Sequence, residues 1–421
     1  MNLLYHWDDT TITLNTRDAR YSDIWGFEIS NRDYVVMGST FGANFFDITD
    51  PVNSYFIDSV QGAVTGSSVN HRDYKEFKGY VYACGQQDAA TLQIMDCNYL
   101  PDSVIVVYDS DSLFSQAHNL YIDSVSERLY ACGADSNGLS IYSLVDPVNP
   151  ELLLHYNDVG SVHDMYSRND TLYLNCGSSG LFVVDLIDVS NPELIGSLTQ
   201  YPGQGYNHSG WLNAQGNQYV FTDEDYGRDI KICDVSDLGN IEIIGTINSG
   251  VSPNSVAHNA FIKDEVIYVS YYNDGFQMFR IVPPPSPAKI GYFDTFLPAQ
   301  DDDYRGAWGC YPFFDNGIVA ISDRNSGLYI LDTSPALALV VSENHLVKKT
   351  VFPNPTTGKV RISGCDKGCE VVIVDVFGRL VIRKQSSNGL DLSSLKNGTY
   401  FIQVTDKEVS TFDVLIKADV Y

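Results

Sequence analysis

Short apolar segments separated by turn residues recur along the first 334 residues of the chain. One repeat unit has an apolar stretch after a His or Trp and a second stretch such as RLYACGA at 128–134. After a Gly or Asn turn come a third stretch such as LFVVDL at 181–186 and a fourth such as PELIGSL at 192–198. Segments of this kind predict β-strands. A long apolar period of 3.6 residues is missing, so helical repeats are disfavoured.

The unit occurs seven times. Its opening phrase reads in turn DIWGF, NHRDY, AHNLY, VHDMY, NHSGW, AHNAF and GAWGC, marked by Trp25, His71, His118, His163, His208, His258 and Trp308. The separations between these positions are 46, 47, 45, 45, 50 and 50 residues. Four short strands in each period of about 40 to 50 residues are typical of a propeller blade. The predicted fold class is therefore all-β, with a seven-bladed β-propeller.

The seventh unit has only three strands before Asp332. Residues 2–8, NLLYHWD, resemble ELLLHYND at 151–158, the fourth strand of the third unit. We predict that this N-terminal strand completes the last blade, because it would remove an exposed sheet edge.

The pattern changes after residue 334. Residues 335–349 lack it and are interpreted as a linker, whereas residues 350–421 contain the segments KVRIS, EVVIVDV, LVIRKQ, TYFIQVT and TFDVLIKA. Gly, Asn and Ser turns separate these segments. We therefore expect a propeller at 1–334, a linker at 335–349 and a small immunoglobulin-like β-sandwich at 350–421.

Charge restricts the partners. The formal net charge of −27 repels nucleic acids and anionic membrane surfaces, and it leaves cations as plausible ligands. No run of about 18 apolar residues is present, so we expect no transmembrane segment. The N-terminus lacks the basic and apolar regions of an export signal, and we interpret the chain as a mature or truncated form.

The repeats resemble a known family. GLFVVDLIDVSNPELIG at 180–196 looks like the LVIVD repeat, and GLYILDTS at 327–334 is a second copy. With SVHDMYSRNDTLYLNCG at 161–177 and GAWGCYPFF at 306–314, these phrases resemble the choice-of-anchor B family of surface propellers. The resemblance runs over about residues 20–334 and implies a location rather than a reaction.

The C-terminal segments VFPNPTTGKVRIS, VVIVDVFGRLV and LDLSSLKNGTYFIQV resemble the type A sorting domain of the type IX secretion system. The residues that fall where this pattern expects them are Asn354, Gly358, Gly378, Arg379, Leu395, Gly398 and Tyr400. The resemblance implies passage across an outer membrane, with the type IX machinery as the partner of residues 350–421. The expected location is the outer-membrane surface or the extracellular space. The final ADVY extends past the usual basic end of the family.

The repeated histidines are the main candidates for chemistry. The first strand of each propeller blade lines the central channel, so residues at the start of these strands should converge on one channel mouth. The candidate metal ligands are His71, His118, His163, His208 and His258, and Trp25 and Trp308 are expected to complete the ring. Neutral imidazole suits zinc, copper, iron or nickel.

Polar residues near this ring supply oxygen atoms. The candidate ligand-binding residues are Trp25, Trp308, Asp73, Asn119, Asn259, Asp274 and Asp323, and Asp164, Ser209, Asp223 and Glu224 are expected beside them. The histidines also have a structural interpretation, in which each ring bonds the backbone of the next blade. Both interpretations remain open at this point.

Three functions are compatible with these features. We favour a binding module that captures a glycan, a protein or a small molecule at the channel mouth. The second is a metal-dependent hydrolase with Glu224 or Asp164 as general base. The third is a purely structural surface protein.

Two local features are weaker. Cys365 and Cys369 bracket a hairpin-like turn, and a disulfide between them is compatible with an oxidising compartment. The acidic segment Asp301–Asp303 lacks the spaced ligands of a calcium loop and is interpreted as a solvated turn.

Overall fold

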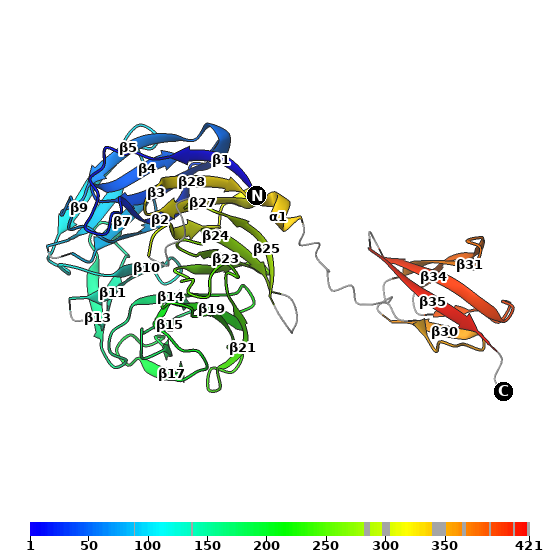
Figure 1. Ribbon diagram of the computed structural model, residues 1–421. Coiled ribbons are helices and arrows are strands. Elements are labelled where there is room, and N and C mark those ends of the chain that lie inside the picture. The colour runs from blue at the N-terminus through cyan, green and yellow to red at the C-terminus, as the bar shows by residue number, and fades with distance from the viewer. Residues whose placement is uncertain are drawn as a thin grey trace. The chain divides into compact units, whose positions relative to one another are not determined.

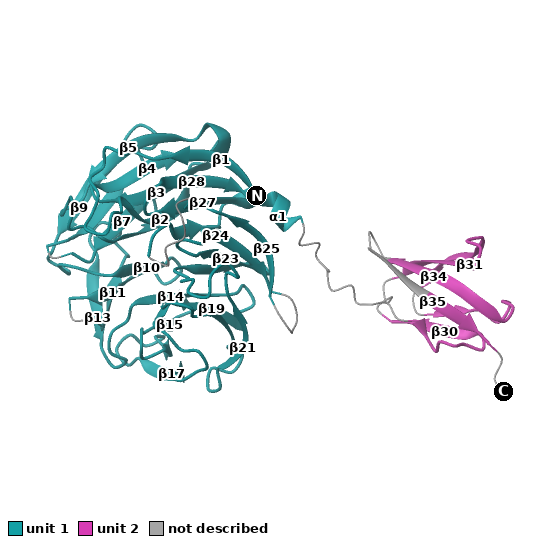
Figure 2. Ribbon diagram, viewed as in Figure 1, with its two compact units in different colours: residues 1–339 teal, residues 340–421 magenta. Residues whose placement is uncertain are grey.

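The computed structural model describes residues 1–87, 89–135, 138–281, 287–296, 304–338, 351–363, 368–386, 389–406 and 409–418, without the side chains of 406–413. The chain forms two compact units, Met1–Leu339 and Val340–Tyr421 (Figure 2). Asp301–Asp303, Cys365 and residues 339–349 of the expected linker lie outside the described residues.

Seven four-stranded antiparallel sheets form the described part of the first unit (Figure 1). Sheet 1 contains β2 (Tyr21–Ile29), β3 (Arg32–Ser39), β4 (Gly42–Asp47) and β5 (Tyr55–Gln61). Sheet 2 contains β6 (Arg72–Phe77), β7 (Tyr80–Gly85), β8 (Leu92–Asp96) and β9 (Ile105–Ser110). Sheet 3 contains β10 (Asn119–Asp123), β11 (Arg128–Ala134), β12 (Gly138–Ser143) and β13 (Glu151–Tyr156). Sheet 4 contains β14 (Asp164–Arg168), β15 (Thr171–Asn175), β16 (Leu181–Asp185) and β17 (Glu193–Leu198). Sheet 5 contains β18 (Asn207–Leu212), β19 (Gln218–Asp223), β20 (Ile230–Asp234) and β21 (Glu242–Ile247). Sheet 6 contains β22 (Ala260–Lys263), β23 (Val266–Ser270), β24 (Phe276–Arg280) and β25 (Ala288–Phe293). Sheet 7 contains β26 (Ala307–Tyr311), β27 (Ile318–Asp323), β28 (Gly327–Asp332) and β1 (Asn2–Trp7).

The sheets follow one another in a circle. The first strands contact each other in the order β2, β6, β10, β14, β18 and β22, and β26 contacts both β23 and β2. The first strands therefore enclose a central channel, as in a propeller. In the described part of the chain, three short helical turns lie outside the sheets: η1 (Pro51–Asn53), η2 (Asp315–Gly317) and α1 (Ser334–Leu337).

The circle closes through the N-terminal strand. β1 pairs antiparallel with β28, and the register places Trp7 opposite Leu328 and Asn2 opposite Asp332. The prediction that residues 2–8 complete the last sheet is confirmed. Trp7 strengthens the closure because its ring stacks at 5.8 Å on Phe56 of the neighbouring sheet 1.

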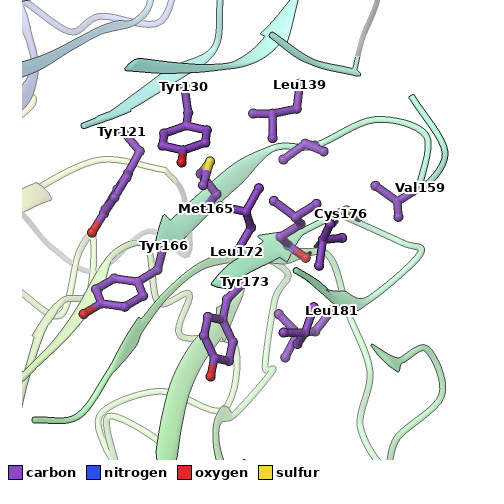
Figure 3. Packing of buried hydrophobic residues seen from close by; sticks show 14 of the residues in the cluster. Tyr121, Tyr130, Leu139, Val159, Met165, Tyr166, Leu172, Tyr173, Cys176 and Leu181 are labelled. Carbon is purple, nitrogen blue, oxygen red and sulfur yellow. Dashed lines mark hydrogen bonds between the residues drawn. The ribbon is translucent and has the colours of Figure 1, made fainter. Parts of the chain in front are cut away.

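The space between neighbouring sheets is filled by large apolar and aromatic side chains. Between sheets 3 and 4, Tyr130 and Leu139 belong to the same buried cluster as Met165 and Leu172 (Figure 3). Strand side chains alternate between the two faces of each sheet, so every sheet buries one face against each neighbour. This packing holds the first strands, and the residues that precede them, in fixed positions around the channel.

The described residues of the second unit form two antiparallel sheets. One has the order β29 (Val351–Phe352), β30 (Lys359–Ile362), β33 (Gly389–Asp391), and the other has the order β32 (Leu380–Ser386), β31 (Cys369–Asp375), β34 (Gly398–Asp406), β35 (Val409–Lys417). Val360 of one sheet and Ile373 and Leu415 of the other share one buried cluster. Cys369 is disulfide-bonded.

The expected linker starts later than residue 335. Ser334–Leu337 form the helical turn α1, and Ala336 in it is buried in the first unit. The turn forms because Pro335 stands near its N-terminus, where a missing backbone N–H costs nothing. Among the described residues, no helix has the length and apolar character needed to cross a bilayer.

Candidate functional site

The five repeated histidines and Trp308 form a closed ring of aromatic side chains, called here the histidine ring. Consecutive ring centroids from His71 through His118, His163 and His208 to His258 are 4.6, 4.0, 4.3 and 4.4 Å apart. Trp308 lies 4.2 Å from His258 and 5.6 Å from His71. The expected convergence of the five imidazoles and Trp308 is therefore present in the structure.

One nitrogen atom of several rings fastens neighbouring sheets together. His71 Nε2 lies 2.7 Å from the carbonyl oxygen of His118, and His163 Nδ1 lies 3.1 Å from that of His208. His258 Nδ1 lies 2.6 Å from the carbonyl oxygen of Trp308. A carbonyl only accepts hydrogen bonds, so each of these nitrogens carries the proton. These bonds match the structural interpretation of the repeated histidines.

Nitrogen atoms of His118, His163, His208 and His258 lie close to one another or to Glu224. His208 Nε2 lies 3.5 Å from Glu224 Oε2, and His258 Nε2 lies 3.9 Å from Glu224 Oε1. The ligand atoms of His208, Glu224 and His258 all lie within 4.8 Å of one another, as do those of His118, His163 and His208. Tyr272 donates its hydroxyl hydrogen to Glu224 Oε1 and orients that carboxyl group.

Burial keeps the imidazoles neutral. Together with the neighbouring histidines, it lowers the pKa of His163 and of His208 to about 3. The pKa values of His71, His118 and His258 are also lowered by burial. Burial raises the pKa of the Glu224 carboxyl group. Neutral imidazole is the form that binds a metal ion, so the protonation states suit coordination.

Arg324 was not identified by the sequence reasoning, although it lies at the ring. Its guanidinium group stacks 4.4 Å from the Trp308 ring centroid, and its Nη2 donates to Asn70 Oδ1 at 2.8 Å. Arg324 follows Asp323 just as Glu224 follows Asp223. A comparison of these two loops would have shown that the residue after the Asp faces the ring.

Trp25 does not lie in the histidine ring, and this expectation is corrected. Its ring packs edge-on against Tyr311 at 5.1 Å, and Lys75 Nζ lies over its face at 4.5 Å. Trp25 and Asp23 line a cavity of about 30 Å³ inside the channel. Ile24 lines the same cavity, so this part of β2 borders the cavity instead of the ring.

Several of the expected oxygen donors line this channel cavity, and one of them, Asn119, also contacts the ring, because its Oδ1 lies 3.1 Å from His71 Nε2. The cavity is lined by the side chains of Asn119, Asp164, Ser209 and Asn259. Asp73 lies beside it and accepts a hydrogen bond from Lys75 Nζ at 2.8 Å. Asn119, Asp164, Ser209 and Asn259 each directly follow a ring histidine in the sequence, and Asp73 follows His71 by two positions.

The acidic residues of the second loops have different roles. Asp223 forms a buried ion pair with Lys231 at 2.8 Å. Asp274 accepts a hydrogen bond from the hydroxyl of Ser255, and Asp323 accepts the backbone N–H groups of residues 325 and 326 at 2.8 and 2.9 Å. Among the described second-loop acids that were expected at the mouth, Glu224 is the one within 4 Å of ring nitrogens.

The described sheets and their circular order define the first unit as a β-propeller. Residues 350–418 match the family described as "Secretion system C-terminal sorting domain". The protein is accordingly exported by the type IX route to the cell surface or the extracellular space, and its tail engages that machinery. This agrees with the location and the partner expected from the C-terminal segments.

Solved structures similar to the chain share its fold at low identity. A protein from Lactobacillus plantarum is 11% identical with a TM-score of 0.53, over 88% of this chain and 98% of its own. The β-propeller domain of Cps50 (Swd1) from Myceliophteria thermophila is 9% identical with a TM-score of 0.54, over 79% and 99%. A putative 6-phosphogluconolactonase from Bacteroides uniformis is 12% identical with a TM-score of 0.54, over 92% and 100%. No curated protein matches the sequence.

The tail gives a direct prediction for export. A chain that ends at residue 338 keeps every described strand of the first unit but loses the matched sorting domain at 350–418. When both chains carry the same N-terminal export signal in a bacterium with the secretion system, we expect the shortened chain to be absent from the surface and the medium. Immunoblots of the cell fractions check this, with the full chain as control. Equal export of both chains would contradict the role of the tail.

Proposed function

We propose that the protein is a surface or extracellular binding module that holds a divalent transition metal at the histidine ring and captures its ligand there. The observation that carries this proposal is the convergence of His208, His258 and Glu224, whose ligand atoms lie within 4.8 Å of one another. Two imidazoles and one carboxylate are a donor set suited to zinc, iron, copper or nickel.

The protonation of His258 supports a cation at this place. Its Nδ1 donates to the Trp308 carbonyl oxygen, so its Nε2 carries a lone pair that points toward the Glu224 carboxyl group 3.9 Å away. A lone pair and a carboxylate oxygen that face each other repel, unless a proton or a metal ion lies between them. The same bond to the carbonyl fixes the ring orientation, as an outer-shell partner does in metal sites.

His258 has two roles in this proposal. Its Nδ1 bonds the Trp308 carbonyl oxygen of the neighbouring sheet, and its Nε2 is available to the metal, as is Nε2 of His208. Three protein ligands leave at least one coordination position open, and this position would take an oxygen or nitrogen atom of a glycan, a protein or a small molecule. The rings of Trp308 and Tyr272, whose centroids are 5.9 Å apart, supply apolar contact beside it.

Metal analysis of the purified, tag-free full chain tests the proposal. We expect about one transition metal ion per chain in the parent, and loss of that metal in the double variant His208→Ala, His258→Ala. Because these changes also remove ring packing, Glu224→Gln is the sharper variant. It keeps the shape of the side chain, and we expect at least about a 10-fold weaker metal affinity.

His155→Ala is the matched control. His155 lies outside the ring on β13, where its Nδ1 contacts the hydroxyl of Ser140 at 2.8 Å. This variant should keep the metal content of the parent. Equal metal in the parent, Glu224→Gln and the double variant, or no metal in the parent after reloading with zinc, would overturn the proposal and leave the histidines as structural residues.

A metal-dependent hydrolase is a second candidate function. The observation that favours it is the pKa of the Glu224 carboxyl group, which burial raises toward the range of a general base or acid. Asp164, the other candidate base, lies in the channel cavity instead of at the ring. Turnover of ester, lactone or phosphate substrates that disappears on chelation and in Glu224→Gln would establish this activity.

The proposal also includes the finer architecture. The seven sheets are assigned as seven propeller blades with LVIVD-type repeats of the choice-of-anchor B kind, spanning residues 1–334. Residues 335–349 are assigned as the linker, apart from the turn α1, and 350–421 as an immunoglobulin-like sandwich. The support is the agreement between the repeat period of the sequence and the strand order of each sheet.

A further inference from the structure

The channel cavity holds an unusual concentration of buried charge. Asp23 and Asp164 line it together with Lys75, and Asp73 lies directly beside Lys75. Asp23 and Asp73 are 6% and 0% exposed. Three carboxyl groups therefore share one ammonium group in a space screened from water, and buried charge of one sign needs compensation by a cation or by protons.

The geometry leaves the lysine unable to serve every carboxyl group. Lys75 Nζ donates to Asp73 Oδ1 at 2.8 Å and to the backbone carbonyl oxygen of residue 74 at 3.0 Å. Asp73 Oδ2 also accepts the backbone N–H of Leu120 at 2.6 Å. Asp73 is thus compensated within the protein. Asp23 and Asp164 accept backbone N–H groups from Ile24 and Met165, and they are the carboxyl groups that a cation or protons must compensate.

A second observation, independent of the acidic residues, points to a ligand in the cavity. Asn259 lines it and is only 8% exposed, yet its Oδ1 has no hydrogen-bond partner. A buried amide oxygen left without a partner costs free energy unless something binds it. Ser209 also lines the cavity, and its hydroxyl hydrogen is donated to the His258 carbonyl oxygen at 3.1 Å, which leaves oxygen lone pairs for the cavity.

We propose that this cavity is a site for a hard divalent cation, Ca²⁺ in the extracellular medium, held by the carboxylates of Asp23 and Asp164, the amide oxygen of Asn259 and the hydroxyl oxygen of Ser209. These are oxygen donors from four different sheets, the ligand type that Ca²⁺ takes. The cavity of about 30 Å³ has room for an ion and about one water molecule. The site is distinct from the histidine ring, whose nitrogen donors suit softer metals.

Terbium luminescence tests the site in the full chain. Tb³⁺ binds calcium sites, and an indole nearby sensitises its emission; Trp25 and Trp211 both line the cavity. After removal of metals and long equilibration, we expect emission excited through tryptophan to saturate at about one Tb³⁺ per chain. Excess Ca²⁺ should abolish it. We expect a loss of at least about 10-fold in affinity for Asp164→Asn, an isosteric change that removes a ligand charge.

Two further variants separate this site from other acidic groups. Asp146→Asn changes an exposed turn carboxylate, which accepts the backbone N–H of Val148, and should leave the titration unchanged. Glu224→Gln should also leave it unchanged, because that residue belongs to the histidine ring. If the Asp164→Asn protein is poorly folded by circular dichroism, Asn259→Asp replaces it, with an expected gain in affinity from the added charge.

Three outcomes would overturn the proposal. Emission that is insensitive to both Asp164→Asn and Asn259→Asp would place Tb³⁺ elsewhere. Emission that disappears in Glu224→Gln would assign it to the histidine ring. Absence of sensitised emission in the parent would mean that no cation binds in the cavity and that its carboxyl groups are compensated by protons and water. None of these results bears on the transition-metal content of the ring, so the two sites are tested separately.

Discussion

Gly327→Ala is expected to destabilise the propeller by about 1 to 3 kcal/mol more than a Gly→Ala change with the same backbone strain. Gly327 has a φ of +90°, and a Cβ atom there would lie 2.2 Å from the Trp7 carbonyl oxygen. That oxygen belongs to the closing strand β1, so the methyl group must push β1 away from β28. The free energy of unfolding in urea measures the effect.

Gly66→Ala is the matched control. Gly66 has a φ of +89°, and a Cβ atom added there would meet nothing within 4 Å. The left-handed backbone alone should cost this variant about 1 to 2 kcal/mol. The difference between the two variants therefore isolates the contact with β1. Equal losses would show that the closing strand tolerates displacement and contributes little to the stability of the ring.

Lys231→Met is expected to destabilise the protein by about 3 to 5 kcal/mol at neutral pH, because it leaves the buried carboxylate of Asp223 without its counter-ion. The side chains of Lys231 and Asp223 are 1% and 0% exposed, and Lys231 Nζ lies 2.8 Å from Asp223 Oδ2. The same ammonium group donates to the carbonyl oxygens of Asp229 at 2.6 Å and Gly203 at 3.1 Å. Urea unfolding of the purified variant checks the loss.

The double variant Lys231→Met, Asp223→Asn separates charge from packing. It removes both charges and keeps the side-chain volumes, and the Tyr201 hydroxyl that donates to Asp223 Oδ1 at 2.7 Å can donate to the new amide oxygen. We expect the double variant to recover most of the lost stability. A double variant as unstable as Lys231→Met would mean that lost hydrogen bonds and packing, rather than the unpaired carboxylate, cause the effect.

The repeat pattern predicted the sheets and the closing strand for an identifiable physical reason. Trp7 of β1 lies opposite Leu328, just as Tyr156 of β13 lies opposite Leu139. The resemblance between residues 2–8 and 151–158 is therefore a resemblance between two outer strands in the same register. The alternation of side chains along each strand is a local property, and it can be recognised in a short stretch of sequence.

The level of each residue within the channel could not be predicted in the same way. Asp73 pairs with Cys84 and Asn119 pairs with Cys132, so these two residues are equivalent within the YACG repeats. His71 precedes Asp73 by two positions, whereas His118 precedes Asn119 by one. One extra residue, Arg72, shifts the register between ring and strand, and nothing in the phrases NHRDY and AHNLY shows it. Trp25 was also misplaced, because the phrase DIWGF does not show which level of the channel its ring reaches.

The roles of the individual nitrogen atoms in the histidine ring could not be predicted from the sequence either. Repetition of His indicates neither which nitrogen bonds the next carbonyl nor which faces Glu224. His71 uses Nε2 for this bond, whereas His163 and His258 use Nδ1. The choice depends on the rotamer of each ring, which tertiary packing sets. The sequence therefore identified the histidines that lie in the ring but left their chemical role open.

The closing strand also has a consequence for the time course of folding. Asn2 Nδ2 donates to Asp332 Oδ2 across 330 residues of sequence. Contacts of such high sequence separation form late, since the entropy of closing the intervening loop must be overcome first. Until then the outer edge of β28 stays unpaired and open to other chains. The rate of ring closure thus sets how long each newly exported molecule remains vulnerable to aggregation.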